Sequence, residues 1–161
     1  GKDGVPMGTV ATRNGEGQSL VRLGVTTGGY GLVETQNGKG QRLVRLGATA
    51  DGGLVTARNG KGQELVRLGA TADGNGIIET KNDKGQALVR LSDVSGNGAV
   101  QTKNSRGQTL VELGVLSASG RVLINNSDGR GVAIMSAGSD GYGAFVTFDK
   151  DGKVTSVTPA P

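Results

Sequence analysis

Apolar and polar residues alternate in two short segments that recur about every 22 or 23 residues along this chain. The first segment, for example residues 33–35 (Val-Glu-Thr), ends just before an Asn, and the second, for example residues 43–46 (Leu-Val-Arg-Leu), begins six residues after it. Alternation with a period of two, in segments rich in β-branched residues, is typical of half-buried strands. No apolar pattern recurs at helical spacing over a helix-length window. The pattern therefore predicts two short strands per repeat, no helix, and an all-β fold.

A turn signal separates the two predicted strands of each repeat. In six copies an Asn stands three residues before a Gly, and in a seventh, degenerate copy an Asp does so. Asn-Gly, as at residues 37–38, favours a tight primed turn because both residues tolerate positive φ. The predicted structural turn residues are Asn14, Asn37, Asn59, Asn82, Asn104, Asn126 and Asp149.

The strand–turn–strand segment keeps a length of 14 residues from copy to copy, from four residues before the Asn to nine after it. All variation in length lies in the second joint, which connects one segment to the next: Val33 follows Leu23 by ten positions, but Val55 follows Leu46 by nine. Repetition at this period is typical of stacked or fibrous arrays and not of a globule folded around one pocket. We therefore expect an elongated array of seven rigid strand–turn–strand units.

Two architectures fit such a unit. In the first, each repeat is a hairpin, and the hairpins form an antiparallel meander that needs partner chains, such as three chains around one axis. In the second, each repeat is one coil of a single-chain parallel β-solenoid with ladders of stacked Asn and Gln. The solenoid would place Arg22, Arg45 and Arg67 on one another about 4.8 Å apart, which is destabilising. The sequence thus favours an intertwined homotrimeric β-prism or β-helix shaft, with the solenoid as the alternative.

A second set of apolar residues points away from the Val residues beside them, so that both faces of the predicted strands are partly apolar. A single-chain solenoid would leave this second stripe in water, and such stripes usually mark an interface. We therefore expect an interchain apolar stripe at Leu20, Leu43, Leu65, Leu88, Leu110, Leu32, Leu54 and Ile77.

The last two copies differ from the others, which divides the chain into a regular repeat shaft (1–119) and atypical C-terminal repeats (120–161). Large apolar side chains here replace residues that are mostly polar or small elsewhere. Terminal repeats often cap an array, and an apolar patch can also dock a neighbouring fibre domain or subunit. The candidate cap or docking residues are Ile134, Met135, Tyr142, Phe145 and Phe148.

The amino-acid composition excludes several classes of function. The chain has 31 Gly and no Trp, so one copy alone has little large apolar surface for a core, and stacking of repeats or chains is the expected remedy. It has no Cys and no His, which excludes disulfides, thiolate and imidazole metal ligands and a Ser-His-Asp triad. Residues 149–152 (Asp-Lys-Asp-Gly) resemble the start of a calcium loop but lack its Glu at position twelve, so we interpret them as a solvated turn. We expect no enzymatic activity, no cofactor and no metal.

Charge and hydropathy limit the partners. The net charge is +4, but the basic residues alternate with Glu and Asp, as on a solvated charged face. We expect no nucleic-acid partner, and a module that binds polyanions, with steep salt dependence, remains a weaker alternative. No apolar run approaches the roughly 18 residues of a membrane span, so no membrane insertion is expected.

One copy, residues 53–69 (GLVTARNGKGQELVRLG), resembles the Gly-rich β repeats of fibrous shafts. The resemblance is to trimeric phage tail-fibre and bacterial surface-fibre segments, and it covers nearly the whole chain. It implies a structural stalk on a virion or cell surface, in which a homotrimer separates an anchor from a receptor-binding tip. The period is longer than that of the triple β-spiral of viral fibres. Curli-like amyloid subunits share the period, although this chain lacks their Gln-x-Gly-x-Gly-Asn pattern, so an extracellular amyloid-like or solenoid subunit is the alternative.

Overall fold

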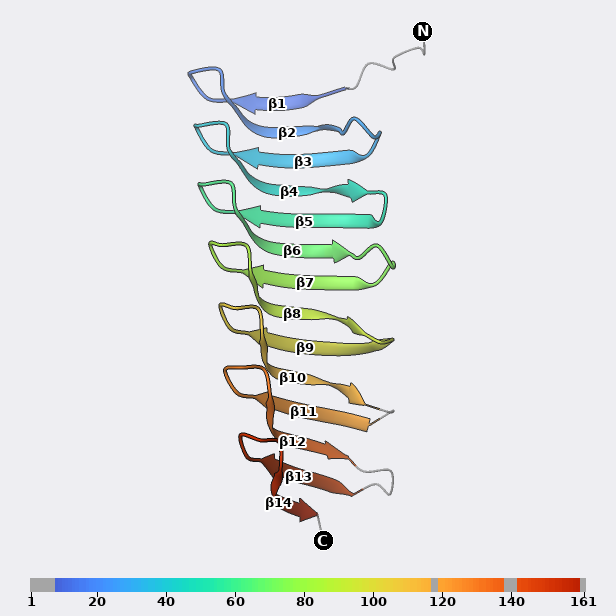
Figure 1. Cartoon of the computed structure of the whole chain (residues 1–161). Coiled ribbons are helices and arrows are strands. Elements are labelled where there is room, and N and C mark those ends of the chain that lie inside the picture. The colour runs from blue at the N-terminus through green and yellow to red at the C-terminus, as the bar shows by residue number, and fades with distance from the viewer. Residues whose placement is uncertain (1–7, 117–118, 138–141, 160–161) are drawn as a thin grey trace. The chain divides into compact units, whose positions relative to one another are not determined.

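The computed structural model describes residues 8–116, 119–137 and 142–159, which form strands and turns without any helix. The chain divides into two compact units, residues 1–85 and 86–161, and each has seven strands in its described part (Figure 1). The strands of the first unit are β1 (Val10–Arg13), β2 (Ser19–Val25), β3 (Gly31–Gln36), β4 (Arg42–Thr49), β5 (Gly52–Arg58), β6 (Glu64–Ala70) and β7 (Gly76–Lys81). Those of the second are β8 (Ala87–Val94), β9 (Asn97–Lys103), β10 (Thr109–Leu116), β11 (Ser119–Asn125), β12 (Gly131–Ala137), β13 (Gly143–Phe148) and β14 (Val154–Pro159).

Within each unit, every strand pairs with the next strand along the chain in antiparallel orientation, from β1 to β7 and from β8 to β14. Each sheet is therefore a meander of hairpins, and the prediction of an all-β repeat fold is confirmed. The alternative of a single-chain parallel β-solenoid is wrong. The physical reason is the length of the joints: most of the described ones are loops of two or three residues, which reverse the chain, whereas parallel neighbours need a long crossover.

The turns that begin with Asn differ from the predicted primed turns. In the third copy the Asn59 amide donates to the carbonyl of Gln63, and the Gly62 amide donates to the carbonyl of Asn59. Gly62 has a φ of 82°, while Gly60, the residue of the Asn-Gly pair, does not have positive φ. This is a three-residue hairpin loop in which the third residue takes the left-handed conformation. The position that requires Gly is thus the one three residues after the Asn.

Among the second joints of β2 to β9, two lengths occur, and they account for the variation in repeat spacing there. Residues 26–30 and 71–75 form three-residue loops, whereas Thr49 pairs with Gly52 and Val94 with Asn97 across two-residue loops. The 94–97 loop contains the primed type of turn, since Ser95 and Gly96 both have positive φ (54° and 83°). The primed turn therefore lies at a second joint and not at an Asn.

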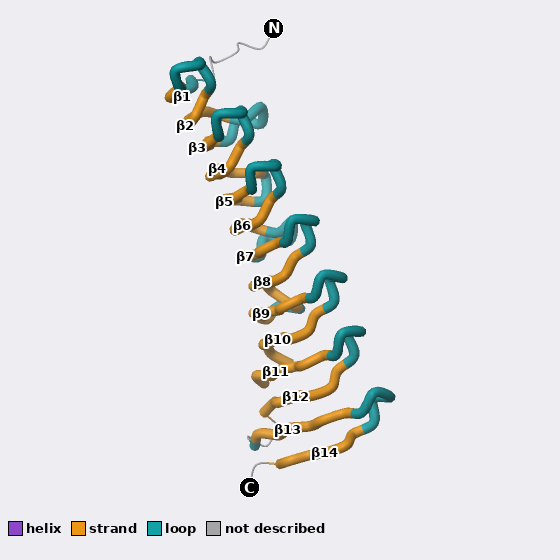
Figure 2. The backbone as a smooth tube through the Cα atoms, turned by 90° about the vertical axis from the view of Figure 1, so that its left-hand side faces the viewer, coloured by secondary structure: helices purple, strands orange, loops and turns teal. Residues whose placement is uncertain are grey.

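A bulge follows most Asn turns, one residue before the Val of the second strand. In the second copy Thr35 pairs with Val44 and Gln36 with Arg42, so Leu43 is an extra residue in β4. Bulges bend a strand and increase its twist, and Figure 2 shows the strand after each turn leaving the loop with a bend. The corresponding extra residues are Leu20, Leu65, Leu110, Val132 and Thr155.

Each unit is a single layer, so its buried side chains are covered by neighbours on the same face of the sheet. In the first unit Glu34 (1% exposed), Thr56 (2%), Leu32 and Ile77 (both 8%) are buried, and the pairing register places all four on one face. We call this the Arg–Glu face and the opposite one the apolar face.

Candidate interaction faces

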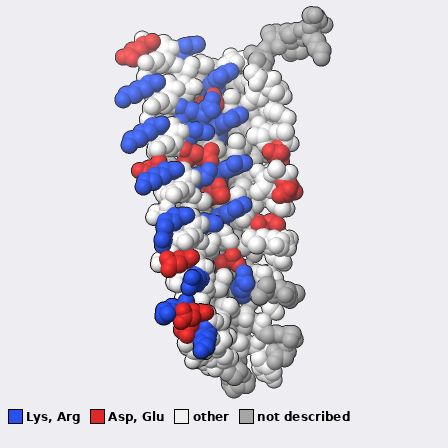
Figure 3. Space-filling model, in the orientation of Figure 1, with Lys and Arg blue, Asp and Glu red and all other residues white. Residues whose placement is uncertain are grey.

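The Arg–Glu face of the first unit carries a cross-strand row of long charged side chains. Each member is paired directly with the next, so antiparallel pairing places an Arg opposite a Glu or a Thr and never opposite another Arg. Opposite charges facing one another stabilise such a ladder. The row is Arg22, Glu34, Arg45, Thr56, Arg67 and Glu79. Figure 3 shows basic and acidic side chains interspersed along the middle of this face.

Glu34 is the most deeply buried residue of this row. Arg42, which belongs to the bulge of β4, forms an ion pair with it, and Arg22 and Arg45 face it across the strands on either side. A depression of about 240 Å³ lies here, and its lining includes Val25 and Leu32. The carboxylate is thus neutralised by an arginine of its own sheet.

Beside the charged row, large aliphatic side chains lie opposite glycines. Leu32 pairs with Gly47, and Leu54 pairs with Gly69. A Cβ on Gly69 would lie 3.0 Å from the Gly53 carbonyl oxygen and 3.3 Å from Leu54 Cδ1, so the glycine leaves the space that the leucine occupies. The aliphatic side chains of this face therefore pack against their own sheet.

The predicted interchain stripe divides between two settings. Leu32, Leu54 and Ile77 lie on the Arg–Glu face, where each is paired with a Gly. The bulge residues of the stripe are Leu20, Leu43, Leu65 and Leu110. Leu88 is half-buried in β8. Its assignment to an interface between chains stays a prediction.

The apolar face of the first unit has a continuous central row of aliphatic side chains that no described residue of the unit covers. Leu23, Leu46, Leu68 and Ile78 are 49%, 52%, 47% and 40% exposed. The row is Leu23, Val33, Leu46, Val55, Leu68 and Ile78, each directly opposite the next. An uninterrupted apolar stripe of this kind is typical of an interaction surface.

Smaller side chains flank this central row on both sides. Toward the Asn turns the next row alternates Val with Thr or Ala, and toward the second joints the corresponding row contains mostly Ala and Gly. The first flanking row is Val21, Thr35, Val44, Ala57, Val66 and Thr80. The second is Val25, Gly31, Ala48, Gly53, Ala70 and Gly76. On the apolar face, the side chains in the middle of each strand thus extend farthest from the sheet.

The second unit repeats this arrangement on its apolar face. Leu113, Met135 and Phe145 are 49%, 56% and 39% exposed. They belong to a central row of Leu91, Val100, Leu113, Val122, Met135 and Phe145.

The opposite face of the second unit changes from charged to apolar along the sheet. Gln101 Nε2 donates to Glu112 Oε2 at 2.7 Å, and Arg121 forms an ion pair with the same carboxylate. The hydrogen bond from Arg121 is the main reason why the pKa of Glu112 is lowered. Beyond this pair the row continues as Leu123, Ile134, Val146 and Val157.

The candidate cap residues lie on both faces. Met135 pairs with Phe145 on the apolar face, while Ile134 lies on the other. Tyr142 is 57% exposed and directly precedes β13, and Phe148 ends that strand. Strands β11 to β14 and the turns at Asn126 and Asp149 follow the pattern of the earlier copies, while the side chains change; the division at residue 120 stays a prediction. Its role as a cap or docking segment stays a prediction.

The Asn side chains close their own turns. Asn104 Oδ1 accepts hydrogen bonds from the amides of Arg106 (2.9 Å) and Gln108 (3.1 Å), and its Nδ2 donates to Gln108 Oε1 at 2.8 Å. Asn14, Asn37 and Asn59 make the same contacts with the Gln four residues later. The sequence predicted the Asn but not this partner: in these four turns the Gln binds the Asn of its own turn and is not part of a stacked ladder.

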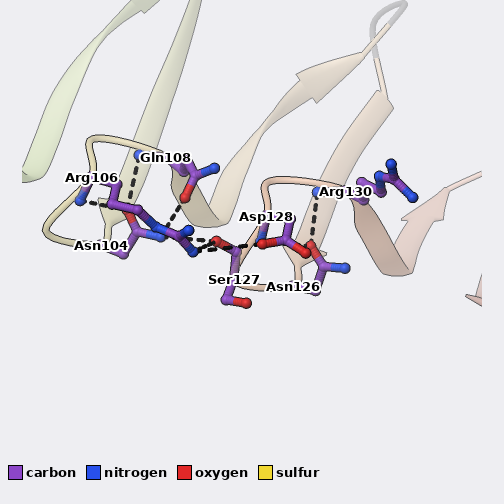
Figure 4. A network of polar contacts seen from close by, with 7 residues as sticks. All are labelled: Asn104, Arg106, Gln108, Asn126, Ser127, Asp128 and Arg130. Carbon is purple, nitrogen blue, oxygen red and sulfur yellow. Dashed lines mark hydrogen bonds and ion pairs between the residues drawn. The ribbon is translucent and has the colours of Figure 1, made fainter. Parts of the chain in front are cut away.

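Neighbouring Asn turns of the second unit also contact each other (Figure 4). Asn104 Nδ2 donates to the Ser127 carbonyl at 3.2 Å, Arg106 donates to the same oxygen, and the Arg106 guanidinium lies 3.6 Å from the Asp128 carboxylate. In the last copy Asp149 retains only the accepting role, toward the amides of Asp151 and Lys153. This explains why an Asp can replace the Asn there.

In the described residues, no three His, Cys, Asp or Glu side chains come together as a metal site would require. The same residues contain no helix long and apolar enough to cross a bilayer. Neither a model of a known protein family nor a curated protein matches this sequence.

Proposed function

We propose that this protein is a non-enzymatic structural shaft in which three copies turn their apolar faces inward and their Arg–Glu faces toward solvent. The observation that carries the proposal is the uncovered central row of the apolar face. Such a homotrimer would be a fibre segment of the tail-fibre or surface-adhesin type, holding an attachment tip away from its anchor.

The energetics favour burial of this face. Full burial of a Leu or Ile side chain is worth about 1.5–3 kcal/mol. Leu23, Leu46, Leu68 and Ile78 are about half buried already, so covering the remainder would contribute on the order of 1 kcal/mol each. The corresponding row of the second unit adds to this. Three chains that bury every such row gain enough to offset the entropy of association.

The profile of side-chain size favours three chains over two. When two sheets stack face to face, the gap between them is nearly uniform, at about 10 Å, and a row of Ala and Gly along one side would leave it underfilled. In a triangular prism the space is deepest over the middle of each sheet and narrows toward the corners. Tall Leu, Val and Ile in the middle with smaller residues on both sides match the triangular section.

The strand lengths fit the same geometry. Strands β2 to β7 have six to eight residues, which corresponds to about 20–26 Å at about 3.3 Å per residue. An equilateral triangle with sides of that length places each sheet about 6–8 Å from the axis, compared with about 5 Å from the mid-plane of two stacked sheets. Leu and Met side chains can fill that depth.

The decisive experiment measures the mass of the chain in solution at micromolar concentration by sedimentation equilibrium. We expect the mass of three chains, and we expect the double substitution Leu46→Lys with Leu68→Lys to give the mass of one. The matched control, Gly15→Lys with Gly60→Lys, adds the same two charges at turn tips where a Cβ meets nothing within 4 Å and should remain trimeric. A monomeric or dimeric parent chain would contradict the proposed trimer.

A further inference from the structure

The two ends of the strands in the first unit differ in charge. At three of the four Asn turns, a Lys stands two residues after the Asn, namely Lys39, Lys61 and Lys84; the first turn has Glu16 at that position, and Asp83 precedes Lys84. At the second joints the loop tips instead carry Asp51 and Asp73. The three Lys and these two Asp side chains are exposed. In Figure 3 most of the side chains that project at one end of the strands are basic, with a few acidic ones among them, while isolated acidic ones lie at the other end.

Within the described part of the chain, these charges have no ion-pair partner. None of the ion pairs among the described residues involves Lys39, Lys61, Asp51 or Asp73. The loop amides of Lys39 and Lys61 bind the Asn oxygens, which fixes each backbone and leaves the ammonium groups projecting. Other cations near this end do have partners: Arg42 binds Glu34, and Lys81 binds Glu64.

A ring of three copies brings opposite strand ends together. Threefold closure is heterologous, so each corner joins the Asn-turn end of one chain to the second-joint end of the next. Asn turns and second joints alternate along the meander, one strand apart, at about 4.8 Å. At equal height the Asp51 loop of one chain would therefore lie midway between the levels of Lys39 and Lys61 of the next, and the Asp73 loop between those of Lys61 and Lys84.

We infer that a second copy of the chain binds at this acidic second-joint edge. The Asn turns of that copy, which carry Lys, contact Asp51 and Asp73 at each corner. The inference rests on the proposed homotrimer and specifies its contact. The apolar faces supply most of the stability, while the Lys and Asp side chains add an attraction between unlike charges at each corner.

The test is a charge swap read out by sedimentation equilibrium at low and high salt. Reversal of the cations, Lys39→Glu with Lys61→Glu, should raise the chain concentration at which the trimer dissociates by about tenfold or more in low salt, because six sites per trimer become repulsive. Adding Asp51→Lys with Asp73→Lys to that variant should restore assembly. The conservative control, Lys39→Arg with Lys61→Arg, should assemble like the parent.

The outcomes separate this inference from the proposed function. A trimeric parent whose dissociation is unchanged by the reversed cations overturns the corner contact and leaves the trimer intact. Loss of assembly that the four-residue swap does not restore also overturns it, since the defect is then not one of paired charge. A parent that is monomeric at every salt concentration overturns both. The exposed loops tolerate these substitutions, and unchanged far-UV circular dichroism of each variant checks the fold.

Discussion

At the scale of single residues, the Asn turns show how one side chain fixes a loop. Asn59 Oδ1 accepts from the amides of Lys61 and Gln63, and Nδ2 binds Gln63 Oε1 at 2.7 Å. Each bond is worth about 1 kcal/mol at most in a partly exposed site. The same set recurs from turn to turn, so the loops are alike although their tip residues differ.

The Gly of the Asn turn provides a residue-scale prediction. Gly62→Ala should lower the free energy of unfolding by about 1 kcal/mol, because its φ of 82° places a Cβ in the left-handed region. Gly60→Ala, two residues earlier in the same loop and without positive φ, should be neutral or slightly stabilising. Urea unfolding of the two variants measures the difference, and equal effects would contradict our description of the turn.

At the scale of the strand, pairing register decides which side chains interact. Glu112 of β10 lies between Gln101 of β9 and Arg121 of β11, both of which bind its carboxylate. Residues that are far apart in the sequence lie side by side on adjacent strands because successive strands reverse direction. The same reversal separates the Arg residues that a parallel stack would place together.

Glu112 gives a prediction for pH dependence at this scale. Its pKa is lowered in the folded state, so its contribution to stability is present above the ordinary carboxyl pKa and is lost as the pH falls through the lowered value. Glu112→Gln should therefore destabilise the protein at pH 7 and have a much smaller effect at pH 3. Urea unfolding at both pH values is the measurement.

The matched control for that experiment is Glu16→Gln. Glu16 is an exposed glutamate at the tip of the first Asn turn, and it is in none of the ion pairs of the described residues. Its substitution should leave the free energy of unfolding near that of the parent at both pH values. An equal loss for Glu112→Gln at pH 7 and pH 3 would contradict the role of the carboxylate charge.

At the scale of the whole molecule, the difference between the two faces is the main property. Glycines let Leu32 and Leu54 lie against their own sheet, and Arg42 neutralises Glu34, so the Arg–Glu face needs no partner. Among the described residues of either unit, none gives the apolar face such a cover. A sheet with one self-covered face and one open apolar face is suited to assembly.

Assembly makes stability depend on concentration, which is the prediction at this scale. If folding and association are coupled, the Tm of the parent chain should rise as the chain concentration is raised a hundredfold, because mass action favours the associated state. Leu46→Lys with Leu68→Lys should have a lower Tm that no longer depends on concentration. Differential scanning calorimetry at several concentrations tests both. A concentration-independent Tm for the parent would argue against coupling.

The sequence by itself determined the strands and the positions of the turns, and it favoured antiparallel hairpins over a parallel solenoid. These are local properties, set by alternation of period two and by Asn and Gly at fixed offsets. It also indicated that both faces of the strands are partly apolar, but alternation alone does not distinguish a covered apolar row from an exposed one.

Only the tertiary structure decided how the two faces differ. The covering of Leu54 depends on Gly69, which lies opposite it across a pair of strands, and the burial of Glu34 depends on a bulge that turns Arg42 toward it. Likewise, the sequence predicts a primed turn at the Asn-Gly pairs, but the structure has it at Ser95 and Gly96. Alternation along one strand shows that neighbouring residues point to opposite faces. The burial of a side chain depends on which residues of the adjacent strands lie beside it, and only the pairing register determines those residues.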